Sequence, residues 1–149
     1  MKQRMAARKL APEAYRAVAE LDKRVAESGI DRGLYLLIKI RASQINGCAF
    51  CIDLHTREAR KRGEAEDRIY ALNAWRESPL FSEAERAALG LTEVVTLLSE
   101  TRVPEEVWEE AEGAFGEREL ANVLMAVVAI NAWNRIGVAT RMQPRRATR

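Results

Sequence analysis

Residues 31–63 read DRGLYLLIKIRASQINGCAFCIDLHTREARKRG, and the expected fold is built around this stretch. An aspartate that can cap a helix opens the segment 31–45, and its part 34–40 is apolar on most sides except at one lysine. The pair Asn46-Gly47 is a turn signal that breaks this helix. A second helix then runs over about residues 48–62, where a glycine ends it. We therefore predict a central, buried helix joined by a tight turn to a second one.

The same helical periodicity extends outward along the rest of the chain, and no segment shows the alternation typical of a strand. Further helices are predicted over about 12–28, from about Ile69 to before Pro79, from Ser82 to about Leu98, from Pro104 to about Phe115 and from about Glu117 to Met142. The loops between them are short. We expect one all-α domain over residues 1–149, with a basic end at 143–149 that is frayed.

The composition excludes several classes of protein. The chain has 149 residues, 48% of them apolar and 31% charged, which is typical of a globular domain that buries a core. The formal charge is only +2, so nothing indicates a nucleic-acid or membrane-surface partner. No apolar run approaches the ~18 residues of a membrane span, and the basic N-terminus lacks the apolar core of a secretory signal. The expected compartment is the cytoplasm.

One short segment carries reactive side chains. Cys48, Cys51 and His55 are the two cysteines and the single histidine of the chain, and on a helix they share one face. The preceding turn places Cys48 at the helix N-terminus, where unpaired N–H groups and the helix dipole favour a thiolate. His55 lies one turn beyond Cys51, so its imidazole could take the Cys51 proton or stabilise the thiolate.

Three interpretations of this segment remain open. In the first, which the spacing favours, the two thiols cycle between dithiol and disulfide. In the second, Cys48, Cys51 and His55 bind a metal, but a structural zinc site needs four ligands and Asp53 faces away. In the third, the cysteines are small buried side chains beside a core histidine. The first interpretation requires no metal and no cofactor.

The wider stretch RASQINGCAFCIDLHTREA, residues 41–59, resembles the AhpD-like group of the carboxymuconolactone decarboxylase family, single-domain type. The similarity rests on the SQING approach, the C-x-x-C pair and the histidine four residues after the second cysteine. The stretch INAWNR at 130–135 is also like that of single-domain members. The resemblance covers about residues 12–142.

The resemblance implies an all-helical fold that assembles into trimers or hexamers, and a thiol-dependent peroxidase or disulfide reductase acting on alkyl hydroperoxides. It makes Cys51 the thiol that is oxidised to a sulfenic acid, Cys48 the resolving thiol and His55 part of a proton relay. An external dithiol would reduce the resulting disulfide, and no metal, flavin or haem is needed. The dipole favours Cys48 as the more acidic thiol, but we follow the resemblance and expect Cys51 to attack first.

The sequence departs from the family at one position of the relay. AhpD has a glutamate twelve residues before the first cysteine, and this chain has Leu36 there, which cannot carry a proton. Glu58 and Asp53 are candidate replacements by proximity, although we expect both to be solvated. The departure keeps a second hypothesis open, namely a helical module that senses redox state or relays electrons without peroxidase activity.

Other notable side chains are assigned to packing. Three tryptophans are expected in the core or in a subunit contact rather than against a substrate: Trp75, Trp108 and Trp133. Phe50 and Ile52 are expected to form an apolar wall beside Cys51. Asn131 and Asn134 lie on an otherwise apolar helix, and surface exposure is the simpler expectation for them.

Overall fold

The computed structural model describes residues 2–144, so the predicted fraying of the basic end falls mostly on residues outside the described part. Within that part the chain is helical and contains no strand, as predicted. The elements are α1 (Ala7–Leu10), α2 (Pro12–Ala26), α3 (Arg32–Ile45), α4 (Ala49–Lys61), α5 (Glu66–Ala71), the 3₁₀ helix η1 (Leu72–Glu77), α6 (Glu83–Thr96), α7 (Leu98–Thr101), α8 (Glu105–Ala114) and α9 (Glu117–Thr140).

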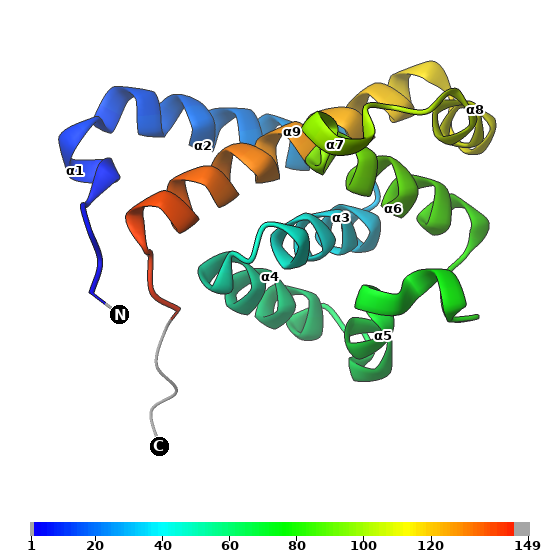
Figure 1. The fold of residues 1–149 in the computed structure, drawn as a ribbon, viewed down its shortest axis with the longest axis horizontal. Helices are drawn as coiled ribbons and strands as arrows, with labels where there is room; N and C mark the ends of the chain where they lie inside the picture. Colours follow the sequence, from blue (N-terminus) through cyan, green and yellow to red (C-terminus); the bar gives the residue numbers. More distant parts are fainter. Residues whose placement is uncertain (1, 145–149) are drawn as a thin grey trace.

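Helix α3 occupies the centre of the molecule and packs against α4, α6 and α9 (Figure 1). Its N-terminus is capped by Asp31, whose carboxylate accepts a hydrogen bond from the N–H of Leu34 at 2.8 Å. Residues 34–40 are all buried, including Lys39. The prediction of a central, buried helix at this position is therefore confirmed.

Helix α9 is the longest element, and it runs beside α2 across the same side of the molecule (Figure 1). It is the only helix among residues 2–144 that is long and apolar enough to cross a membrane, although no such span was predicted. Half of its apolar window is buried inside the fold. Val123, Val127 and Ile130 lie in the core without exposure, which is the behaviour of a core helix in a folded protein.

The predicted boundaries are wrong at two places, both outside the central pair of helices. The helix predicted through Ile69 and Trp75 divides into α5 and η1, with a non-helical backbone at Ala74 (φ −122°, ψ 35°). The next helix is capped by the predicted Ser82 capping box, but Leu98, which was expected in it, begins the separate short helix α7. The apolar pattern continues across the first bend because Leu72 and Trp75 of η1 still pack in the core, whereas Leu98, after the second bend, is 53% exposed.

Candidate functional site

The turn between α3 and α4 sets the position of the first cysteine. The N–H of Gly47 bonds to the carbonyl of Gln44 at 3.2 Å, and the N–H of Cys48 bonds to that of Ser43 at 2.9 Å. These two bonds form a Schellman motif, which needs a left-handed residue, and Gly47 has a φ of +63°. Cys48 then becomes the N-cap residue of α4.

A buried amide network ties this turn to α9. The Asn46 amide nitrogen lies 3.0 Å from the side-chain oxygens of Asn131 and Asn134. Asn134 in turn donates to the hydroxyl of Ser43 at 2.9 Å, and Asn131 donates to that of Thr96. Asn131 is 8% exposed and Asn134 is 1% exposed, so the expectation of surface exposure is wrong. Both can be buried because their side-chain amides have hydrogen-bond partners inside the fold.

The two cysteines form a close pair against α9. Their sulfurs are 2.8 Å apart, both are free thiols, and both residues are buried. Gly137 of α9 makes this possible, because a Cβ at that position would lie 2.8 Å from the Cys48 sulfur and 3.8 Å from the Cys51 sulfur. Nothing in the sequence pattern around Gly137 points to this role, since the residue it accommodates is 89 positions away.

The two thiols of this pair differ in acidity. A hydrogen bond from Cys51 is the largest cause that lowers the pKa of Cys48 to about 7, and backbone N–H groups at the start of α4 add to it against burial. The same contact is the largest cause that raises the pKa of Cys51 above its ordinary value, and burial adds to it. The shared proton therefore stays on Cys51, and the thiolate forms on Cys48, as the helix dipole predicts.

Cys51 and His55 line one cavity of about 230 Å³, which we call the Cys51 cavity. Its other lining residues are Tyr15, Asp22, Lys39, Phe50, Leu54, Trp133 and Met142. Burial, and then the nearby charge of Lys39, lowers the pKa of His55 to about 4, so its imidazole is neutral at pH 7. The fold thus brings the predicted histidine to the same cavity as one predicted cysteine.

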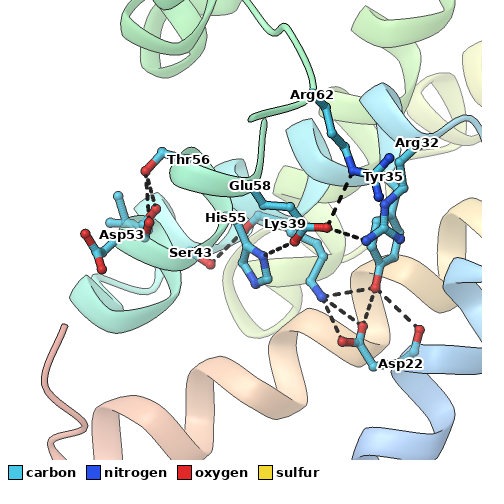
Figure 2. A network of polar contacts seen from close by, with 11 residues as sticks. Asp22, Arg32, Tyr35, Lys39, Ser43, Asp53, His55, Thr56, Glu58 and Arg62 are labelled. Carbon is cyan, nitrogen blue, oxygen red and sulfur yellow. Dashed lines mark hydrogen bonds and ion pairs between the residues drawn. The ribbon is translucent and has the colours of Figure 1, made fainter. Parts of the chain in front are cut away.

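A lysine–aspartate pair forms the polar part of the Cys51 cavity. The Lys39 ammonium lies 2.9 and 2.8 Å from the two carboxylate oxygens of Asp22 and 3.0 Å from the Tyr35 hydroxyl (Figure 2). Burial alone would raise the pKa of Asp22, but the charge and hydrogen bonds of Lys39 and Tyr35 lower it overall. The sequence indicated a polar position within α3 at Lys39, but no local spacing indicated a partner on α2.

A second carboxylate lies beside the histidine. The Glu58 carboxylate is 3.8 Å from His55 Nδ1, and it forms an ion pair with Arg32 (Figure 2). His55 Nδ1 is buried and has no closer polar partner among residues 2–144. The hydrogen bond and charge of Arg32 lower the pKa of Glu58 against the effect of burial. Glu58 and Asp53 were both expected to be solvated, but both are paired, Glu58 with Arg32 and Asp53 with Arg57.

The aromatic and aliphatic side chains predicted beside Cys51 or in the core lie only in part where the sequence predicted. Phe50 lines the Cys51 cavity as predicted, but Ile52 does not, because it projects from a different side of α4. Trp75 is buried in the core, and the partly buried Trp108 packs against the same core. Trp133 instead lines the cavity, with its ring 4.9 Å from that of Tyr15 in an edge-to-face contact.

The chemical capacity of the site follows from these positions. The cysteine pair offers a thiolate, a thiol and a short path to a disulfide, and His55 offers a neutral base in the cavity of Cys51. Leu36, at the family's glutamate position, is buried in the apolar core. Among residues 2–144, no three His, Cys, Asp or Glu side chains form a group that could hold a metal ion.

Comparisons with known proteins bear on this arrangement. A sequence model of the carboxymuconolactone decarboxylase family matches residues 12–94. Uncharacterized protein YdfG of Bacillus subtilis (strain 168) is 44% identical over 139 residues, which cover 93% of this chain and 95% of YdfG. ATU0492 of Agrobacterium tumefaciens, a protein of unknown function described as a candidate antioxidant defence protein AhpD, is 42% identical with a TM-score of 0.95, covering 98% and 100% of the two chains. An uncharacterized peroxidase-related protein with an AhpD core from Ralstonia eutropha JMP134 has a TM-score of 0.80 at 18% identity over 93% and 74% of the chains, and this likeness shows the fold alone.

Proposed function

The chain belongs to the carboxymuconolactone decarboxylase family and has an AhpD-like fold, and from this premise we propose that it is a thiol peroxidase that reduces organic hydroperoxides. Membership of this family indicates a peroxidase-related role in general. The observation that supports thiol peroxidase activity is the pair of free thiols whose sulfurs lie 2.8 Å apart. One of them, Cys51, lines the same cavity as the neutral histidine His55. Residues 1–149 would act as one catalytic domain in the cytoplasm.

In the first step, Cys51 attacks the terminal oxygen of the hydroperoxide. The Cys51 sulfur bonds to that oxygen, the O–O bond breaks, and the products are a Cys51 sulfenic acid and an alcohol. The Cys51 proton must move to the departing alkoxide. We assign His55 to relay this proton within the cavity without holding it, because burial makes a charged imidazolium costly there. We assign Glu58 to orient the imidazole through its Nδ1 side.

In the second step, Cys48 resolves the sulfenic acid. Its sulfur attacks the Cys51 sulfur, forms the disulfide and releases water once the hydroxyl takes up a proton. In the reduced pair the hydrogen bond from Cys51 lowers the pKa of Cys48 to about 7, so a thiolate is present on Cys48 at neutral pH before Cys51 is oxidised. A dithiol reductant then returns both cysteines to thiols and becomes oxidised itself. The cycle needs no metal, flavin or haem.

The shape of the Cys51 cavity favours an organic hydroperoxide over hydrogen peroxide. Phe50, Leu54 and Trp133 give it an apolar wall, and its volume of about 230 Å³ exceeds what hydrogen peroxide would fill. The charges of Lys39 and Asp22 offset each other, so the cavity offers no single charge to a substrate. A small, largely apolar hydroperoxide fits these features.

We also propose that the protein works as a trimer or hexamer of identical chains. Helix α9 presents an apolar row, Met125 and Val128 one turn apart, to solvent at 38–40% exposure. Such a row suits contact with another copy of the chain. Size measurement by light scattering tests this, and a monomer at micromolar concentration would exclude it.

A thiol count tests the proposed reaction. Reduced protein mixed with one equivalent of cumene hydroperoxide should lose both free thiols and release one equivalent of cumyl alcohol. Cys51→Ser should retain its thiol and make no alcohol. Thr56→Ser, on the same helix but away from the cysteine pair, serves as the matched control and should behave as the unmodified chain. A thiol count that hydroperoxide does not change would rule out peroxidase activity.

Leu36 specifically favours one second candidate, a redox sensor or electron relay, because it removes the glutamate of the AhpD relay. In that case the pair would still form a disulfide with an oxidant such as diamide, and it would have a measurable reduction potential. Its reaction with cumene hydroperoxide would be no faster than that of a free thiol in solution. The two rates measured side by side separate these functions.

A further inference from the structure

The two cysteines of the pair line two different depressions of the molecule. Cys51 lines the Cys51 cavity described above. Cys48 lines a separate hollow of about 480 Å³, which we call the Cys48 hollow. Its lining residues are Arg4, Gly47, Cys48, Ala49, Gly137, Val138, Arg141, Met142, Gln143 and Pro144. Only Met142 borders both depressions, so a molecule in one does not occupy the other.

The Cys48 hollow is positively charged. Among residues 2–144, Arg4 and Arg141 line it and no acidic side chain does. The N-terminus of α4, with its positive dipole end, begins at the same place. The Cys51 cavity differs in this respect, because Lys39 and Asp22 contribute one charge of each sign.

The C-terminus of α9 does not cancel this positive charge. Its last four carbonyls, which would otherwise be free acceptors, all receive hydrogen bonds. The carbonyls of Gly137 and Val138 accept hydrogen bonds from the N–H groups of Met142 and Arg141. Arg4 donates to the other two, through its guanidinium to Ala139 and through its backbone N–H to Thr140. The same contacts fasten the N-terminal segment beside α9 and so form one side of the hollow.

We propose that the Cys48 hollow binds the reductant, and that the reductant is a small thiol carrying a carboxylate. This inference rests on the proposed function, because it concerns the disulfide which that cycle forms. The incoming thiolate and the carboxylate are both anions, and the guanidinium groups of Arg4 and Arg141, in a hollow that no acidic side chain of residues 2–144 lines, attract both. Cys48 is only 2% exposed, so a small molecule that enters the hollow reaches its sulfur better than the surface of a folded partner.

The exchange that follows is balanced in atoms and electrons. The reductant thiolate attacks Cys48 from the hollow, the Cys48–Cys51 bond breaks, and Cys51 leaves as a thiolate that takes a proton. The reductant is then held on Cys48 as a mixed disulfide. A second thiol attacks the reductant's sulfur, releases Cys48 as a thiolate and leaves the reductant as a disulfide. Two electrons pass from two reductant thiols to the protein.

The reductant attacks Cys48 because Cys48 borders the hollow, and not because of the acidity of the sulfur that leaves. In the dithiol, each sulfur shifts the pKa of the other mainly through their shared hydrogen bond. That hydrogen bond does not exist in the disulfide, so the acidity difference of the reduced pair does not decide which sulfur is attacked. The line of attack does, because a thiolate approaches a disulfide along the S–S axis from the far side. Cys48 lines the positively charged hollow and Cys51 does not, so an anionic thiolate held in the hollow reaches Cys48 first.

Reduction measured alone tests this proposal independently of any peroxidase activity. The disulfide is prepared with diamide, and its reduction by 3-mercaptopropionate is compared with reduction by 2-mercaptoethanol. Arg4→Gln and Arg141→Gln should each slow reduction by 3-mercaptopropionate about 2- to 5-fold at low salt, as expected for one exposed ion pair. Neither should change the rate with 2-mercaptoethanol by as much. Arg118→Gln removes the same charge at the other end of α9, roughly 30 Å away at about 1.5 Å per residue, and should leave both rates unchanged.

The position of the mixed disulfide gives a second, chemical readout. After brief reaction with 3-mercaptopropionate and quenching with N-ethylmaleimide, peptide masses should place the mercaptopropionate on Cys48 and the maleimide on Cys51. The reverse placement overturns the proposal, as does an equal loss of rate with both thiols in the arginine variants. If hydroperoxide fails to oxidise the pair but this selectivity is found, the peroxidase proposal fails while the hollow keeps its assignment as a thiol site.

Discussion

Replacing Gly137 with alanine tests the packing on which the cysteine pair depends. The new Cβ would lie 2.8 Å from the Cys48 sulfur, where an ordinary contact is about 3.5–4.0 Å. One of the two groups must therefore move by roughly 1 Å. The sulfur is held by the Schellman turn and the buried asparagine network, and the glycine belongs to a long core helix, so neither can move easily.

Two opposing effects set the magnitude. Extra volume in a well-packed core costs about 1–3 kcal/mol. Replacing glycine by alanine inside a helix gains up to about 1 kcal/mol. Gly113 of α8 provides the matched control, since a Cβ there meets nothing within 4 Å. Relative to Gly113→Ala, Gly137→Ala should therefore be less stable by about 1–3 kcal/mol, or roughly 2–12 °C in melting temperature for a chain of this size.

A double-mutant cycle assigns the cost to the sulfur. Thermal and urea unfolding are measured for Gly137→Ala in the unmodified chain and in a Cys48→Ala background, under reducing conditions. The cost should disappear in the Cys48→Ala background, because the atom that the new methyl group meets is gone. An equal cost in both backgrounds would mean that the contact between Gly137 and Cys48 is not what excludes a side chain there.

Three further predictions concern charge in the site. Because the pKa of His55 is lowered from 6.5 to about 4, the unfolded chain binds its proton first as the pH falls, so the unfolding free energy should drop by up to about 3 kcal/mol between pH 6.5 and 4. Urea unfolding of His55→Gln across this range should lack that part of the pH dependence. If the unfolding free energy of the variant changed with pH as much as that of the unmodified chain, the burial of a neutral imidazole would be contradicted. Thiolate absorbance of the reduced protein should titrate near pH 7 and move toward 9.0 in Cys51→Ala, which removes the hydrogen bond that is the largest cause of the shift in Cys48; a midpoint that stays near 7 would assign the shift to the helix instead. Lys39→Met should destabilise the fold by up to about 3 kcal/mol because it leaves the partly buried Asp22 carboxylate without its positively charged partner, whereas Asp22→Asn with Lys39→Met should recover most of that loss; unfolding curves of the single and double variants measure the difference.

The sequence predicts the parts of this structure that local rules control. The cap at Asp31, the turn at Asn46-Gly47 and the helical offset of Cys48, Cys51 and His55 all follow from neighbours within one or two turns. The apolar run in α3 predicts its burial for the same reason. These features fix the central helices and bring the reactive side chains to one helix.

The sequence does not predict what packs against that helix. Gly137, Asn134 and Asp22 reach the site from α9 and α2, and each matters through a contact with a residue far away in the chain. A glycine inside an apolar helix, or an aspartate on the polar side of an amphipathic one, looks the same in sequence whether or not it has such a contact. The same limit explains why Asn134 was expected at the surface.

Trapping the first oxidation product tests most directly that Cys51 attacks the hydroperoxide. Cys48→Ser cannot resolve a sulfenic acid, so after one equivalent of cumene hydroperoxide with dimedone present, peptide masses should show dimedone on Cys51. The unmodified chain should instead show the disulfide and no dimedone adduct. An unlabelled Cys51 in this variant, together with dimedone on Cys48 in Cys51→Ser, would contradict the proposed cycle and assign the attack to the other sulfur.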